Sequence, residues 1–140
     1  MKRTTLRLFS GVLFFLLVTI GFWVPRFTVA GDHPDSPGLQ IHASTVDGYG
    51  VRYELYDFPD RNTQHLMVSI TDPNGKAVLN GKVGFLVKGP DGAKQKSMAM
   101  GMKGAYGADM DFGQKGVYSI KTKAVVGEKK LFDQFDYEVN

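Results

Sequence analysis

Cysteine is absent from all 140 residues of the chain. The protein therefore has no disulfide, and thiolate catalysis, thiol redox exchange and cysteine-ligated zinc or copper sites are excluded. A folded domain of this chain must be stabilised by packing alone. A soft metal ion would have to bind through methionine sulfur or histidine nitrogen, and the chain has six methionines and three histidines.

The motifs of common enzyme active sites are missing as well. The sequence has no nucleophile elbow, no glycine-rich phosphate loop and no His-Glu-x-x-His helix. Two carboxylate pairs, Asp109 with Asp111 and Asp136 with Glu138, have the two-residue spacing that is typical of the exposed side of a strand. We therefore expect no catalytic residues and no enzymatic activity.

The N-terminal residues 1–30 have the pattern of an export signal peptide. Three basic residues precede an uncharged, apolar run over residues 8–25, and Thr28 and Ala30 place small side chains before a cleavage point. We expect cleavage there and a location in the periplasm. The alternative is an uncleaved anchor, because this run is near the minimum length for crossing a bilayer of roughly 30 Å. The domain then lies on the outer face of the cytoplasmic membrane and contacts the membrane only through this segment.

The charge of the remaining chain gives no reason to expect a nucleic-acid partner. Four of the 17 basic residues lie within residues 1–30, and all 14 acidic residues follow them, so the rest of the chain has a net charge of −1. Lys129 and Lys130 form its only basic pair, and no run of cations alternates with aromatic residues. A groove that tracks phosphates needs such a run.

Residues 31–48 are rich in Gly, Pro, Asp and Ser, which predicts a flexible spacer. Residues 49–140 contain short stretches in which apolar and polar residues alternate, separated by turn residues such as Asp72-Pro73-Asn74-Gly75. The pattern predicts an all-β domain of about seven strands, namely 51–55, 66–70, 83–87, 93–102, 106–112, 118–122 and 135–139. We expect an immunoglobulin-like antiparallel β-sandwich, with a small barrel as the alternative.

Met98, Met100 and Met102 form the most distinctive cluster of side chains. At this spacing a single strand would project all three thioethers from one face. Thioether sulfur is a soft, uncharged ligand that favours Cu(I), and His65 and Met67 would add an imidazole and a further sulfur if their strand lies nearby. The alternative favoured by side-chain burial is that the three methionines pack in the core.

Two segments of the chain resemble a known family. HLMVSITDPNGKAVLNGKVGFLV begins at His65, and MAMGMKGAYGADMDFGQKGVYSIK begins at Met98. Together they resemble the YtkA-like domain family of exported bacterial proteins in a strand-opening histidine, an Asp-x-x-Gly-Lys turn, a methionine-rich strand and two Gly-x-Tyr elements. The resemblance implies an immunoglobulin-like fold in the envelope and, for some members, copper handling or metal efflux. It implies His65, Met98, Met100 and Met102 as candidate ligands.

Two functions remain open at this point. The first is an exported binding module that holds Cu(I) weakly on thioethers and passes it to another envelope component. The second is an interaction domain without metal, which docks onto an envelope efflux or respiratory assembly through edge strands or loops. Solvent exposure of the methionine cluster separates the two functions, because buried sulfur atoms would remove the metal site.

Overall fold

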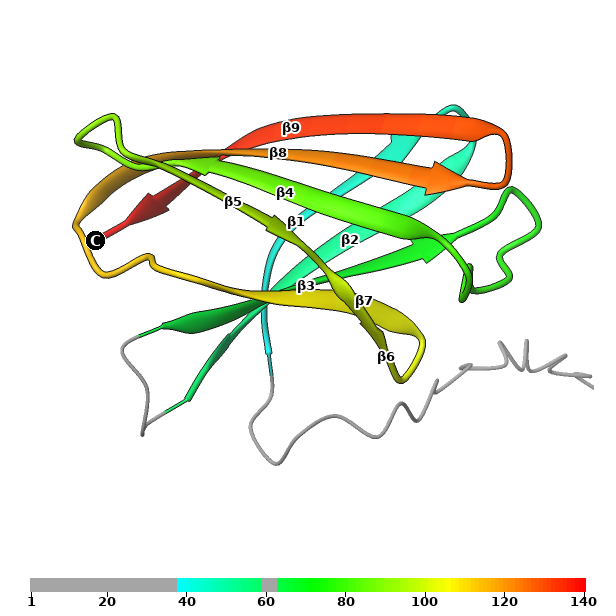
Figure 1. Ribbon diagram of the computed structural model, residues 1–140, viewed down its shortest axis with the longest axis horizontal. Coiled ribbons are helices and arrows are strands. Elements are labelled where there is room, and N and C mark those ends of the chain that lie inside the picture. Colours follow the sequence, from blue (N-terminus) through cyan, green and yellow to red (C-terminus); the bar gives the residue numbers. More distant parts are fainter. Residues whose placement is uncertain (1–37, 59–62) are drawn as a thin grey trace, which may run out of the picture.

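The computed structural model describes residues 38–58 and 63–140. The predicted export segment, residues 1–30, lies outside these residues. Within the described part no helix is long and apolar enough to cross a membrane. The described part is all-β, as the alternation predicted, and its strands form two antiparallel sheets (Figure 1).

The described residues form nine strands. They are β1 (Leu39–Val46), β2 (Tyr49–Asp57), β3 (Gln64–Thr71), β4 (Lys82–Lys88), β5 (Lys94–Met98), β6 (Met100–Met102), β7 (Ala105–Met110), β8 (Gly116–Val126) and β9 (Lys129–Val139). Sheet A has the order β1-β2-β3-β7-β6, and sheet B has the order β5-β4-β8-β9. All neighbouring strands pair antiparallel.

The inner faces of the two sheets pack together into one core. Tyr106, Ala108, Met110 and Phe112 all lie in this core, as their alternation predicted, although β7 ends at Met110. The largest side chains that are fully buried come from both sheets: Tyr53, Leu66, Ile70 and Met110 from sheet A, and Phe85 and Ile120 from sheet B. The core is therefore a contact between two sheets.

The prediction of a flexible spacer over residues 31–48 is wrong for the strand β1, which lies within this range. Asp47 (φ 50°) and Gly48 (φ 82°) form a two-residue turn that joins β1 to β2, and both have the positive φ that such hairpins require. The His42 ring stacks on Phe135 of β9 at 4.1 Å between centroids, and Ser44 Oγ donates a 2.6 Å hydrogen bond to Asp133. Pairing with β2 and contacts with β9 thus order residues whose composition is typical of a loop.

The predicted strand over residues 93–102 is two strands that belong to different sheets. β5 pairs with β4 in sheet B, whereas β6 pairs with β7 in sheet A. The change of sheet occurs at Ala99, whose N–H donates a 2.9 Å hydrogen bond to the Val83 carbonyl and whose methyl group packs against the core. The chain therefore crosses one side of the sandwich at this residue (Figure 1).

Tyr106 connects β7 to the loop that precedes β4. Its buried hydroxyl donates to the Val78 carbonyl at 2.8 Å and accepts from the Gly81 N–H at 2.7 Å. These two bonds satisfy two backbone groups of a segment that has no strand partner of its own apart from the single bridge between Thr71 and Ala77.

Replacement of Tyr106 by Phe should lower the free energy of unfolding by about 1–3 kcal/mol, because the ring stays and two backbone groups lose their partner. Urea unfolding followed by circular dichroism measures this change. Tyr137→Phe is the matched control, since its half-buried ring has no hydrogen bond from its hydroxyl within the described residues. Equal stability of the two variants would contradict a structural role of the Tyr106 hydroxyl.

Candidate functional site

The candidate site lies on the outer face of sheet A. In β3, Leu66 and Val68 point into the core, so His65 and Met67 point outward. Met67 lies opposite Gly107 of β7, and Gly107 lies opposite Met100 of β6. Residues that are paired across neighbouring strands share a face of the sheet. The register therefore brings Met67 and Met100 to one row, with a glycine between them.

Gly107 makes room for the side chains of its neighbours. His65 Nε2 and Met67 Sδ both lie within 2.6 Å of the point that a Cβ atom of residue 107 would occupy. The imidazole nitrogen and the thioether sulfur therefore converge over the glycine. A glycine inside a strand often marks such a close approach.

The imidazole of His65 is oriented by Asp109, which lies opposite it in β7. His65 Nδ1 and Asp109 Oδ1 are 2.6 Å apart, so the protonated Nδ1 donates to the carboxylate. In the neutral ring the other nitrogen, Nε2, then carries a lone pair. Nε2 is buried and has no hydrogen-bond partner among the described residues. A carboxylate on one nitrogen and an unpartnered lone pair on the other is the arrangement of metal-binding histidines.

Met100 and Met102 provide further sulfur atoms on the same face. Met102 lies opposite Ala105, and this pair is the next one on the same face of the sheet after Met100 and Gly107. The side chains are exposed, by 68% for Met100 and 37% for Met102, which contradicts the alternative that they pack in the core. The strands β3 and β6 are roughly 10 Å apart, with β7 between them. Met67 Sδ already lies over Gly107, and the flexible side chain of Met100 is long enough to approach it from the other side.

Met98 does not belong to this group. It lies opposite Gly84 in sheet B, and its sulfur sits 3.2 Å from the Cβ position of that glycine. Its side chain is exposed on the outer face of sheet B, which is the opposite side of the sandwich. The expectation that Met98, Met100 and Met102 share one face of one strand is therefore wrong, because the strand changes sheet at Ala99.

Aromatic side chains border the histidine. The rings of Phe58 and His65 make an edge contact at 6.0 Å between centroids. Tyr56 lies opposite His65 and is 3% exposed, since the backbone at Gly38 packs on its ring without room for a Cβ atom. The Tyr56 hydroxyl donates a 2.7 Å hydrogen bond to Glu54, which also pairs with Arg52 at 2.9 Å. The His65 side chain is only 13% exposed.

The donor set suits a soft ion. The described residues contain no group of three or more His, Asp or Glu side chains that could hold a hard or borderline cation. His65, Met67, Met100 and Met102 instead offer one neutral nitrogen and up to three thioethers, which favour Cu(I). The sequence analysis did not assign Gly107 or Asp109 to this site. The available signal was a glycine and an aspartate two residues apart in a predicted strand.

Burial of Tyr56, together with the hydrogen bond to Glu54 and its negative charge, raises the pKa of this tyrosine from 10.0 to about 12. As the pH rises above 10, the unfolded chain loses this proton first, so stability should fall between pH 10 and pH 12. Tyr56→Phe should make the free energy of unfolding fall less steeply over this range, as measured by urea unfolding at several pH values. The same steepness in both proteins would contradict the shift.

The chain matches no known family model, no curated protein and no solved structure.

Proposed function

We propose that this protein is an exported binding module of the bacterial envelope, which holds Cu(I) on the outer face of sheet A and passes it to another envelope component. The observation that carries the proposal is the convergence of His65 Nε2 and Met67 Sδ over Gly107. A buried lone pair without a hydrogen bond is costly unless a ligand satisfies it. A soft cation beside a thioether would do so.

Thioethers make the site selective. They are neutral and polarisable, so they bind Cu(I) in preference to Mg²⁺, Ca²⁺ or Zn²⁺. Asp109 would fix the ring orientation of His65. Met67 is half-buried, whereas Met100 is exposed by 68%. A site with exposed ligands fits release to a partner, because such ligands can be exchanged without opening the core.

The family resemblance and the fold support the same proposal. An all-β sandwich of two antiparallel sheets is consistent with the immunoglobulin-like fold that the YtkA-like resemblance implies. Export would place the domain where copper handling by some members of that family takes place. The absence of cysteine agrees with a site that is made of methionine and histidine only.

Met67→Leu should lower Cu(I) affinity by at least about ten-fold, since it removes a direct ligand and outer-shell changes alone cost about 10-fold to 100-fold. The volume and apolar character of the side chain stay similar, so the fold should lose less than about 1.5 kcal/mol. Competition titration against a Cu(I)-chelating dye measures the affinity. Met98→Leu is the matched control and should retain Cu(I) like the wild type. Equal retention by both variants, or loss with Met98→Leu only, would reject the site.

Asp109→Asn tests the role of the carboxylate through its effect on His65. The amide is nearly isosteric but is a poorer acceptor for the Nδ1 proton, so the orientation of the ring is less well fixed. We expect Cu(I) affinity to fall by about 10-fold to 100-fold. Asp111→Asn, an exposed neighbour on the loop after β7, should leave the affinity unchanged. An equal effect of the two changes would indicate general charge attraction and contradict orientation by Asp109.

A further inference from the structure

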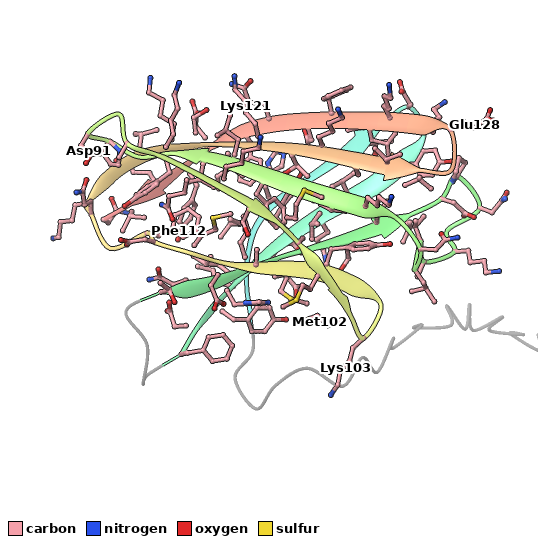
Figure 2. All side chains as sticks on the ribbon, in the orientation of Figure 1. Asp91, Met102, Lys103, Phe112, Lys121 and Glu128 are labelled. Carbon is pink, nitrogen blue, oxygen red and sulfur yellow. The ribbon has the colours of Figure 1, made fainter. Side chains whose placement is uncertain are left out.

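The outer face of sheet B carries a concentration of positive charge that the copper site does not use. Alternation along its strands turns Val83, Phe85, Ile120 and Ala124 into the core and the residues between them outward. Seven exposed lysines point outward from this face: Lys82, Lys88, Lys94, Lys96, Lys121, Lys123 and Lys130. Figure 2 shows Lys121 on the opposite side of the molecule from Met102. We call this surface the lysine face.

Lysines outnumber acidic residues on the lysine face by seven to two. Asp136 and Glu138 point outward only at one end, opposite Ser119 and Val117. Asp133 accepts a hydrogen bond from Ser44 of β1 and thus turns towards sheet A. The chain after residue 30 has a net charge of −1, yet more than half of its basic residues lie on this single face. The segregation of charge points to an anionic partner.

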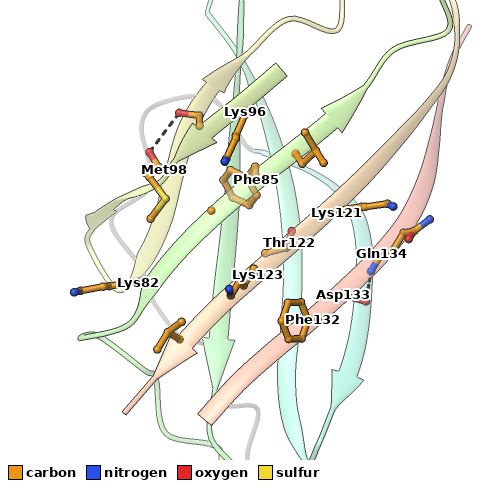
Figure 3. Close-up of a pocket in the computed structure, with 14 residues that line it drawn as sticks. Lys82, Phe85, Lys96, Met98, Lys121, Thr122, Lys123, Phe132, Asp133 and Gln134 are labelled. Carbon is orange, nitrogen blue, oxygen red and sulfur yellow. Dashed lines mark hydrogen bonds between the residues drawn. The ribbon is translucent and has the colours of Figure 1, made fainter. Parts of the chain in front are cut away.

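The centre of the lysine face is apolar and hollow. A depression of about 660 Å³ is lined by Leu86, Met98 and Phe132 and by the stems of the central lysines (Figure 3). Phe132 is 62% exposed, and Lys123 Nζ lies 5.5 Å from the centre of its ring. Gly84, which is paired with Met98 on one side and Lys123 on the other, adds no side chain to the base of this depression. This surface can therefore attract a partner both by its positive charge and by the burial of its exposed apolar side chains.

The residue types favour a lipid surface over a protein. All seven cations are lysine, and none is arginine. Protein interfaces are depleted in lysine and depend on arginine, tyrosine and tryptophan, whereas the lysine face has one aromatic side chain. Surfaces that bind anionic bilayers combine lysines with long, flexible stems and a few large apolar side chains.

We infer that the lysine face docks on an anionic phospholipid bilayer. The ammonium groups contact headgroup phosphates, and Phe132, Leu86 and Met98 reach the boundary of the acyl chains. This contact is separate from any attachment through residues 1–30. It leaves the copper site of sheet A directed away from the lipid, and it does not require that site to bind metal.

The absence of cysteine allows a clean test, because one introduced cysteine is the only labelling site. The full chain with Gln134→Cys carries a polarity-sensitive dye on the lysine face, and the full chain with Thr45→Cys carries it on β1 of sheet A. Vesicles of phosphatidylglycerol and phosphatidylcholine should shift the emission of the dye at residue 134 to the blue. The dye at residue 45 should not respond, and vesicles of phosphatidylcholine alone should shift neither. Because the readout is local, membrane attachment by another part of the chain does not imitate the result.

A matched pair of triple variants tests the lysines. Replacement of Lys96, Lys121 and Lys123 by Gln should weaken partitioning by on the order of 100-fold, since each lysine near an anionic surface contributes about five-fold. Replacement of Lys76, Lys103 and Lys115 by Gln removes the same charge from turns outside the face and should have little effect. Equal losses in the two variants, or no response at residue 134, would overturn the inference. A response to polyglutamate without a response to anionic vesicles would also overturn it and identify the face as a site for an acidic protein.

Discussion

The whole structure depends on the packing of two apolar sheet faces against each other. No disulfide supports it, because the chain has no cysteine. The strands β2, β3, β4, β7 and β8 contribute alternate side chains to the core, and Tyr53, Leu66 and Phe85 are among the most deeply buried. The remaining side chains of each strand must point outward. Packing thus fixes the inner faces and leaves the two outer faces free to differ in chemistry.

The outer faces differ strongly. The outer face of sheet A carries thioether sulfur and an imidazole around Gly107, with Tyr56 and Phe58 beside them. Sheet B exposes lysines around an apolar hollow. Because the two faces lie on opposite sides of one thin domain, binding at one does not block access to the other (Figure 2). A domain that is bound to lipid through sheet B would present its proposed metal ligands to the aqueous side.

Local patterns in the sequence predicted the strands well. The alternation of Tyr106, Ala108, Met110 and Phe112 identified buried side chains directly, since burial of one face is a local property of a strand. The strand β1 was missed because its order comes from pairing with β2 and from the contact of His42 with Phe135, and neither is visible in its composition. Propensity is a weak guide where partners decide the structure.

The candidate site could be predicted only in part. His65 and Met67 share an outward face because of their spacing, which the sequence shows. Their relation to Met100 depends on the register of β3, β7 and β6, which joins residues more than thirty positions apart. The separation of Met98 from Met100 depends on the pairing of β5 with β4 and of β6 with β7, and no local pattern encodes those pairings. Spacing indicates the face of a strand, whereas register and sheet membership are properties of the fold.

The crossing at Ala99 has a further consequence for the edges of the sandwich. An exposed sheet edge offers unpaired backbone groups to other chains and is a site of aggregation. Since one segment pairs first with β4 and then with β7, it covers an edge of each sheet. The edges that it exposes in return are short, because β5 has five residues, two of them outward lysines, and β6 has three. The residue that separates the methionines thus also protects this side of the domain against intermolecular strand pairing.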